Sequence, residues 1–320
     1  MEDMGLNGRN ILVTGGLGFF GSHLIKALIE NGSSVYTTDL VENRRSYYFQ
    51  QRLEKQTIYE QCDVADFRSI KSVIVKNKID FVFHVAAQAI VDTAYYDPLG
   101  TITSNVIGTA NVLEACRQYG KVKGILVTST DKAYGKLPRV NEKMPLSGDH
   151  PYEASKASAD LIAQTYFKTY ELPVVITRFG NVYGEGDLNF NRIVPGIMAS
   201  IIKSQTLKIR SDGKYVRDYV YVKDVVDATL LLARNIRKAK GEAFNISSLE
   251  NLQVIEVVKR IGKVLELKVD YEILSVAKNE IPVQSVDFKK IKNTFGWKPK
   301  NNFSTTAVDI FNWYKDYFAR

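Results

Sequence analysis

A glycine-rich turn between a short apolar run and a helical pattern constrains the fold of this chain more than any other feature. The apolar run covers residues 9–14, and the turn TGGLGFFG after it places Gly15, Gly18 and Gly21 three residues apart. Apolar residues then recur at helical spacing over residues 22–30. Strand, tight turn and helix in this order begin a β-α-β unit, so the N-terminus predicts a strand of a parallel sheet.

The same alternation continues through the first half of the chain. Strands alternating with helices predict an α/β fold with a Rossmann-type, doubly wound parallel sheet. The further strand candidates are residues 34–39, 79–86, 124–129 and 173–178, and the main helical stretches are residues 105–119 and 153–170.

Beyond about Gly180 the pattern is less regular. Residues 181–192 look like a polar loop, and later helices are expected at residues 225–235, 254–265 and 304–318. We therefore expect a nucleotide-binding domain over residues 1–180. A smaller α/β domain over residues 181–320, interleaved with the first, would supply the substrate side.

Composition excludes several other classes of protein. With 320 residues, 45% hydrophobic and 24% charged, the chain is globular, and it has neither an 18-residue apolar run nor a signal-peptide pattern. We expect a cytoplasmic protein without a membrane partner. The net charge of +8 is spread along the chain, which favours an anionic small molecule over nucleic acid. Cys62 and Cys116 fit neither a disulfide framework nor a metal site, so no metal is expected.

The glycine turn predicts a dinucleotide site, because backbone amides at a helix N-terminus can hold a pyrophosphate. Asp39 follows Gly21 by eighteen residues, at the end of the second expected strand. Its carboxylate can accept both hydroxyls of an adenosine ribose and repel a 2′-phosphate, so NAD is expected rather than NADP. The alternative is an aspartate that only caps a turn. Asp63 and Val64, after the next strand-like piece, are candidates to reach the adenine.

Tyr152 and Lys156, in the run PYEASKASAD, are one helical turn apart and project from the same face of a helix. An ammonium beside a phenol favours the phenolate, which can take a hydroxyl proton as hydride leaves the adjacent carbon. The spacing alone is common. Its place after a strand ending in TSTDKAYG makes it more specific.

Together with the glycine turn, HVAAQ, TSTDKAYG, PYEASK, RFGNVYG, RDYVYVKD and GWKPK resemble the motif series of extended short-chain dehydrogenases/reductases along nearly the whole chain. The resemblance implies an enzyme that acts on nucleoside-diphosphate sugars with tightly held NAD. It also implies a homodimer that pairs through residues 105–119 and 153–170. The cofactor contacts carried over are Gly15, Gly18, Phe19, Phe20, Gly21, Asp39, Asp63, Val64, Ala86, Ala87, Gln88, Asn105, Thr128, Tyr152, Lys156 and Phe179.

The run Thr130-Asp131-Lys132 decides the subfamily in this resemblance. An acid and a second acid–base group after the threonine follow the pattern of sugar-nucleotide 4,6-dehydratases, and the Asp-Lys form resembles the CDP-glucose 4,6-dehydratases. Lys132 stands where the dTDP-glucose and GDP-mannose enzymes have glutamate, and it must be neutral to act as a base. The implied roles are Tyr152 as base at O4, Thr130 bonded to O4, Asp131 as acid at the C6 hydroxyl and Lys132 as base at C5.

Three alternatives to a 4,6-dehydratase stay open. If Asp131 only caps the turn and Lys132 is solvated, the chain is an NDP-hexose 4-epimerase of the UDP-glucose or UDP-glucuronate type. Decarboxylation of a uronic acid sugar lacks an evident extra arginine for the carboxylate. A non-catalytic NAD-sensing protein would have no chemical need for Thr130, Tyr152 and Lys156 together.

On the substrate side the resemblance implies contacts from Gln88, Thr130, Asn181, Arg192 and Arg217. An arginine at position 217 suits a diphosphate, because its planar guanidinium donates two parallel hydrogen bonds. The alternative for Arg217 is a surface ion pair. Many relatives carry an Arg-Pro-Gly-Asp turn near residues 278–280, where this chain reads Lys-Asn-Glu, so a second diphosphate-binding arginine is in doubt.

Overall fold

The computed structural model describes residues 5–276 and 281–319, and the chain divides into two compact units. Unit 1 comprises the described residues of Met1–Gly135, Glu142–Phe179 and Val226–Asn245. Unit 2 comprises those of Lys136–Asn141, Gly180–Val225 and Ile246–Arg320.

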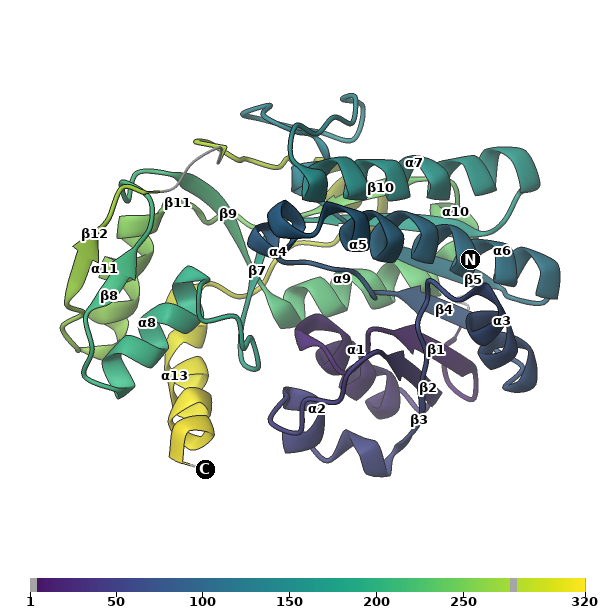
Figure 1. Cartoon of the computed structure of the whole chain (residues 1–320), viewed down its shortest axis with the longest axis horizontal. Helices are drawn as coiled ribbons and strands as arrows, with labels where there is room; N and C mark the ends of the chain where they lie inside the picture. Colours follow the sequence, from purple (N-terminus) through teal and green to yellow (C-terminus); the bar gives the residue numbers. More distant parts are fainter. Residues whose placement is uncertain (1–4, 277–280, 320) are drawn as a thin grey trace. The chain divides into compact units, whose positions relative to one another are not determined.

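A seven-stranded sheet forms the centre of unit 1, in the order β10-β6-β5-β4-β1-β2-β3 (Figure 1). The pairs β1–β2, β2–β3, β1–β4, β4–β5 and β5–β6 are parallel, which confirms the doubly wound fold. The strand order reverses between β1 and β4, and ligands of such sheets bind at this point. The strands are β1 (Asn10–Thr14), β2 (Ser34–Asp39), β3 (Thr57–Gln61), β4 (Phe81–His84), β5 (Gly124–Thr130), β6 (Val174–Phe179) and β10 (Ala243–Ile246).

Helices cover both faces of this sheet, with α6 and α7 packed side by side on one face and α1 on the other (Figure 1). Apolar side chains from α3, α6 and α7 form one continuous core with β1, β4, β5 and β6, and both cysteines lie in it. The helices are α1 (Phe19–Glu30), α2 (Tyr47–Gln50), α3 (Phe67–Lys76), α4 (Val91–Tyr96), α5 (Pro98–Ile102), α6 (Gly108–Tyr119), α7 (Pro151–Tyr170), α9 (Val222–Arg234) and α10 (Ile236–Ala239), with a 3-10 turn at Leu53–Lys55.

Two helices near the expected site differ from the sequence prediction. The helix expected over residues 105–119 begins instead with a π-helical turn, Thr103–Ile107, before α6. Such turns occur often at functional sites. α7 starts two residues earlier than expected, because Pro151 suits the first turn of a helix and the ring of His150 accepts a hydrogen bond from the Tyr152 amide.

Unit 2 contains a three-stranded sheet, β11-β9-β7, and a two-stranded sheet, β12-β8. The expectation of a continuous loop over residues 181–192 was wrong, because its first three residues pair with β9 as a strand. Three residues are too few to show an alternating pattern, and the partner strand lies far along the chain. The elements are β7 (Asn181–Tyr183), α8 (Ile193–Ile202), β8 (Leu207–Ile209), β9 (Val216–Tyr221), β11 (Asn251–Gln253), α11 (Val254–Leu265), β12 (Tyr271–Ile273), α12 (Lys289–Phe295) and α13 (Phe303–Ala319).

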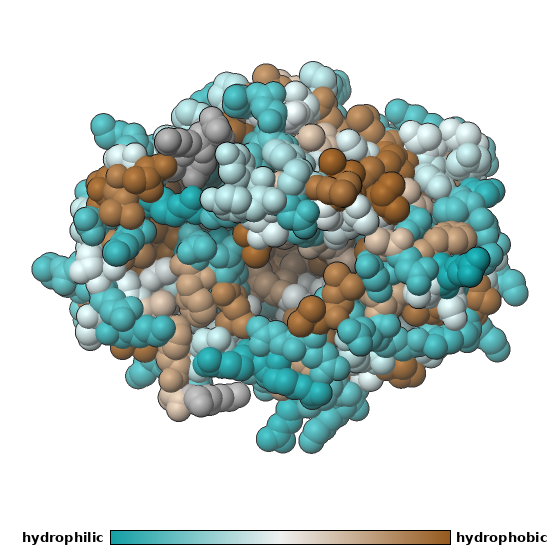
Figure 2. All heavy atoms as spheres, viewed as in Figure 1, coloured by the Kyte–Doolittle hydropathy of each residue, from teal (hydrophilic) through white to brown (hydrophobic). Residues whose placement is uncertain are grey.

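On the face drawn in Figure 2, apolar residues occur in separate groups among hydrophilic ones. Across residues 5–276 and 281–319, none of the helices combines the length and apolar character that a membrane span requires.

Candidate active site

The glycine turn links β1 to α1 in a shape that only glycine allows. Gly15 has a φ of +69°, and a Cβ built on it would lie 2.7 Å from the backbone nitrogen of Ala86, in the loop after β4. A Cβ on Gly21 would collide with the Gly15 carbonyl oxygen. α1 begins at Phe19, and its N-cap residue Gly18 has no side chain to occupy the first amides. The residues therefore fit a dinucleotide pyrophosphate, which backbone amides can hold without a side-chain charge.

Asp39 ends β2 beside this turn. One of its carboxylate oxygens, Oδ2, accepts from the Leu17 amide at 3.1 Å, and the other accepts from the Leu40 amide at 2.9 Å. Burial raises the pKa of Asp39, and these amide hydrogen bonds oppose the rise. The carboxylate thus caps the turn and still has acceptor capacity for ribose hydroxyls, because each oxygen can take a second hydrogen bond.

The three phenylalanines expected to contact the cofactor lie in two different settings. The rings of Phe20 and Phe179 meet edge to face, with centroids 5.1 Å apart. Phe19 instead packs edge-on against the buried His23, with centroids 5.7 Å apart. Unit 1 therefore brings two of the three aromatic rings together.

Asp63 and Val64, the candidates to reach the adenine, are largely occupied with the protein itself. Asp63 accepts from the Ala65 amide at 2.8 Å, which closes the loop after β3. The Val64 side chain is buried in the core against Gly108, and its carbonyl accepts from the Asn111 side chain at 3.0 Å.

Gln88 and Asn105 brace the loop after β4. Asn105 Oδ1 accepts from the Gln88 backbone amide at 2.7 Å, and Asn105 Nδ2 donates to the Gln88 backbone carbonyl and to Ser155 Oγ on α7. The Gln88 side chain bonds to both backbone groups of Ile90 and to Thr101. Both amide groups are thus used within unit 1, and the ligand contacts expected of them remain predictions.

Lys156 is buried on α7, and its Nζ donates to the carbonyl oxygen of Thr128 on β5 at 2.6 Å. Tyr152, one helical turn earlier, is also buried. Burial lowers the pKa of Lys156 to about 8, and the charge of Asp160 opposes part of that shift. The structure thus places an ammonium with a depressed pKa on the same helix face as the phenol.

Thr130 ends β5, and a 3-10 turn, Asp131–Ala133, follows and packs against α7. Thr130 Oγ1 donates to Asp131 Oδ1 at 3.0 Å and accepts from the Lys132 amide at 3.3 Å. Asp131 is buried, and its Oδ2 has no hydrogen-bond partner among the described residues. Lys132 Nζ lies 4.0 Å from Asp131 Oδ1, and its side chain is 23% exposed. A buried carboxylate oxygen without a partner is costly, so Asp131 is a candidate to contact a ligand, and its role stays a prediction.

Sequence reasoning missed a buried network behind this turn. Arg178 on β6 forms two hydrogen bonds, both 2.8 Å, with the carboxylate of Asp160 on α7. Its Nη1 also donates to the Tyr134 hydroxyl at 2.7 Å, which in turn donates to Asn245 Oδ1 at 2.7 Å. One signal was present in the sequence: Tyr152, Lys156 and Asp160 recur at intervals of four residues.

It also missed His84, which joins the end of β1 to the first turn of α6. Thr109 Oγ1 donates to the Asn105 carbonyl at 2.6 Å, so it accepts from His84 Nε2 at 3.0 Å. Thr14 Oγ1 accepts from the Ala86 amide and therefore donates to His84 Nδ1 at 2.9 Å. Burial lowers the pKa of His84 to about 3, which keeps the ring neutral and suits this fixed arrangement.

Unit 2 holds the other residues expected to bind substrate. Asn181 lies on β7, and its side-chain nitrogen is buried without a partner among the described residues. Arg192 precedes α8 and pairs with Asp187 at 3.2 Å. Arg217 on β9 is half-buried, and its Nη1 donates to the carbonyl oxygens of Val216 and Ile281. Backbone contacts therefore help to orient Arg217, and its expected contact with a diphosphate stays a prediction.

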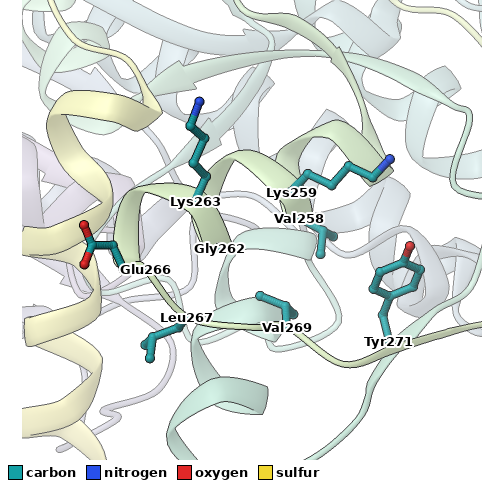
Figure 3. A pocket seen from close by; sticks show the side chains of 8 residues that line it. All are labelled: Val258, Lys259, Gly262, Lys263, Glu266, Leu267, Val269 and Tyr271. Carbon is teal, nitrogen blue, oxygen red and sulfur yellow. The ribbon is translucent and has the colours of Figure 1, made fainter.

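A pocket of about 310 Å³ lies in unit 2 along α11 and the segment after it (Figure 3). Its lining is mainly apolar and includes Val258, Leu267, Val269 and Tyr271, and it contains none of the expected site residues. The segment at residues 278–280, where a second diphosphate-binding arginine was in doubt, lies outside the described residues. Within the part of the chain that the structure describes, no three His, Cys, Asp or Glu residues cluster as metal ligands would.

The doubly wound fold and the glycine turn are typical of enzymes that bind a dinucleotide. Comparison with known proteins identifies the family within this class. The family model described as GDP-mannose 4,6 dehydratase matches residues 12–310. The dTDP-glucose 4,6-dehydratase of Haemophilus influenzae is 30% identical over 95% of this chain and 97% of its own. The chain therefore belongs to this family of sugar-nucleotide enzymes.

Solved structures from the same family include two different activities. A dTDP-glucose 4,6-dehydratase from Bacillus anthracis, in complex with NAD, is 27% identical, with a TM-score of 0.84 over 97% of both chains. A UDP-glucose 4-epimerase from Thermotoga maritima, with UDP-glucose, is 29% identical, with a TM-score of 0.87 over 97% of this chain and 99% of its own. Similarity of fold therefore does not separate dehydration from epimerisation, and the site residues must do so.

Proposed function

We propose that this chain is an NAD-dependent nucleoside-diphosphate-sugar 4,6-dehydratase. The observation that carries the proposal is the buried carboxylate of Asp131, next to Thr130 and Lys132, whose Oδ2 has no hydrogen-bond partner in the described part of the chain. The glycine turn and Asp39 fit a dinucleotide, and NAD, when bound, supplies the acceptor for the C4 hydride and its later donor to C6.

The first half of the reaction uses the buried pair on α7. Tyr152 accepts the O4 proton as the C4 hydrogen leaves, so that a C4 ketone forms. Lys156, whose Nζ is anchored by the Thr128 carbonyl, stabilises the phenolate that accepts this proton. Thr130 Oγ1 is the neighbouring hydroxyl that orients O4.

The second half uses the Asp131–Lys132 pair. The ketone acidifies C5, so Lys132 takes the C5 proton while Asp131 protonates the C6 hydroxyl, which leaves as water. Moving one proton from Lys132 to Asp131 creates both the neutral amine and the carboxylic acid that this step needs, and the elimination restores the ion pair. Lys132 then returns its proton to C5 when C6 gains hydride. The O4 proton held by Tyr152 replaces the one that Asp131 gave up.

The substrate that we propose is CDP-glucose or a close analogue. The Asp-Lys form of the turn resembles the CDP-glucose 4,6-dehydratases, whereas the relatives named above act on dTDP-glucose or UDP-glucose. The diphosphate contact that we propose is Arg217, and Arg192 and Asn181 are the other substrate contacts that we propose in unit 2.

A 4-epimerase is the second candidate. The similarity to the Thermotoga maritima epimerase supports it, and so does the ion pair of Asp131 with Lys132, which also suits a purely structural turn. Epimerisation needs only Tyr152, Lys156 and Thr130.

Mass spectrometry of sugar nucleotides incubated with the purified chain and NAD tests the proposal. CDP-glucose, dTDP-glucose, UDP-glucose, UDP-N-acetylglucosamine and GDP-mannose form the panel, with chromatography to detect isomers of unchanged mass. Loss of one water from CDP-glucose is the expected result. Loss of water from another sugar nucleotide would show that the substrate carries that nucleotide instead of CDP. An isomer without mass loss would establish the epimerase.

We also propose a homodimer that pairs through α6 and α7. Ile107, just before α6, is 47% exposed, and Leu161 on α7 is 51% exposed. Exposed apolar side chains on adjacent helices suit a symmetric helical interface. Sedimentation of the wild type and of Leu161→Glu tests this, because a charge at a symmetric contact should yield monomers.

A further inference from the structure

Tyr134 stands at the junction of the two parts of the proposed active site. Its amide donates to the Asp131 carbonyl at 3.1 Å and closes the 3-10 turn that carries Asp131 and Lys132. Its side chain is fully buried, and the Arg178 guanidinium carbon lies 4.9 Å from the ring centroid. One residue therefore belongs both to the acid–base turn and to the packing beneath α7.

The Tyr134 hydroxyl uses both of its hydrogen-bonding roles. It accepts from Arg178 Nη1 and donates to Asn245 Oδ1, each at 2.7 Å. Nε and Nη2 of Arg178 donate to the carboxylate of Asp160, which lies on α7 one helical turn beyond Lys156. Asp160 and Arg178 are 0% and 2% exposed, so the pair is held in one geometry without competition from water. The hydroxyl thus ties the acid–base turn to the helix of Tyr152 and Lys156.

The two halves of the proposed reaction depend on this tie to different degrees. Oxidation at C4 needs Tyr152, Lys156 and Thr130, which lie on α7 and at the end of β5. Elimination also needs Asp131 and Lys132 at the correct distance from a sugar already held against α7. Displacing a reacting group by about 1 Å can slow a step about 100-fold.

We propose that Tyr134 is a positioning residue whose hydroxyl, by bridging Arg178 and Asn245, holds the Asp131–Lys132 turn in register with α7 and thereby controls the elimination step. This inference rests on the proposed dehydratase function. It assigns to Tyr134 no contact with the substrate.

Single-turnover kinetics of Tyr134→Phe, stopped by rapid quenching and analysed by mass spectrometry, test the inference. The C4 ketone is lighter than the substrate by two hydrogen atoms, and the final product is lighter by one water, so each step has its own signal. The variant keeps the ring over Arg178 and loses only the hydroxyl. Ketone formation should stay within about 3-fold of wild type while elimination slows about 10- to 100-fold, so the ketone accumulates.

Tyr166→Phe is the matched control. It removes a hydroxyl that lies near the C-terminal end of α7 and donates to Glu114 at 3.2 Å. Neither step of the reaction should change in this variant. Asn245→Ala, which removes the acceptor of the Tyr134 hydroxyl, should also slow elimination. It also provides the test if Tyr134→Phe does not fold, as judged by thermal melting.

The outcomes separate the inference from the proposed function. A wild type that forms no dehydrated product overturns the proposed function, and the inference with it. If the wild type forms the dehydrated product but Tyr134→Phe slows both steps equally or leaves elimination unchanged, the inference about Tyr134 is overturned and the proposed function stands. Accumulation of the ketone in Tyr134→Phe, and not in Tyr166→Phe, supports both.

Discussion

The two units hold their site residues in different ways. In unit 1, Lys156, Asp131 and Asn105 are buried, and hydrogen bonds from several elements fix Lys156 and Asn105. In unit 2, Arg192 is half-exposed and has one carboxylate partner, and Arg217 is oriented by backbone carbonyls. The difference indicates that the groups proposed for the chemical step are preorganised, while those expected to bind the nucleotide can adapt.

One ion pair from each unit illustrates how burial sets the cost of losing a partner. Arg178 and Asp160 form a bidentate pair that is almost completely buried, whereas Lys268 and Asp270 pair at the surface with most of each side chain exposed. A buried pair has a large cost when broken, and an exposed pair has little effect. Substitutions at the buried site residues of unit 1 should therefore alter kcat or folding, and those at the expected nucleotide contacts of unit 2 should mainly alter KM.

The largest effect is expected at Tyr152. Without its hydroxyl the O4 proton has no acceptor, so Tyr152→Phe should lower kcat about 10²- to 10⁴-fold with a small change in KM. Steady-state kinetics on the substrate found by mass spectrometry measure this. Tyr170→Phe, at the exposed end of the same helix, is the control and should retain full activity. Full turnover by Tyr152→Phe would refute the assignment of the base.

Next comes the stability of unit 1. Asp160→Asn leaves the Arg178 charge buried without its partner, which should lower the free energy of unfolding by about 3–5 kcal/mol. Chemical denaturation, followed by circular dichroism, provides the measurement. Asp270→Asn should leave the unfolding midpoint unchanged, because its partner Lys268 is solvated. Equal losses in both variants would contradict the contrast between the two units.

A substitution at Arg217 should change KM rather than kcat, the reverse of the effect expected at Tyr152. Lysine keeps the charge but loses the planar pair of donors, and a charge-assisted hydrogen bond contributes about 1.5–3 kcal/mol. Arg217→Lys should therefore raise KM about 10- to 100-fold while kcat changes little. Lys214→Ala, on the same segment, is the control. A fall in kcat with unchanged KM would place Arg217 in the chemical step instead.

The smallest expected effect is a pH dependence from Lys156. The protonated amine is the form that stabilises the phenolate, and its pKa is lowered to about 8, so activity should fall as pH rises above that value. At one pH unit above the pKa of Lys156, kcat/KM should be about tenfold below its value at lower pH. Lys156→Arg, which stays charged, should shift this limb to higher pH. A limb at the same pH in this variant would assign it to another group.

Much of unit 1 could be predicted because its signals are local. The glycine turn, the end of β2 at Asp39 and the spacing of Tyr152 and Lys156 each lie within one or two elements, where sterics and helical periodicity act directly. The π-helical turn at Thr103–Ile107 and the strand β7 could not be predicted in the same way. Each is short, and each is stabilised by partners elsewhere in the chain.

The sequence by itself determined the doubly wound sheet, the glycine turn and the proposed catalytic pair on α7, because backbone geometry and periodic burial require particular residues at short spacing. Only the tertiary structure decided how the polar groups are used. It made Gln88 and Asn105 braces and left one oxygen of Asp131 without a hydrogen-bond partner among the residues described. It also joined Tyr134 to Arg178 and Asn245 across 44 and 111 residues. Hydrogen bonds over such separations depend on how the chain packs, and no local pattern encodes them.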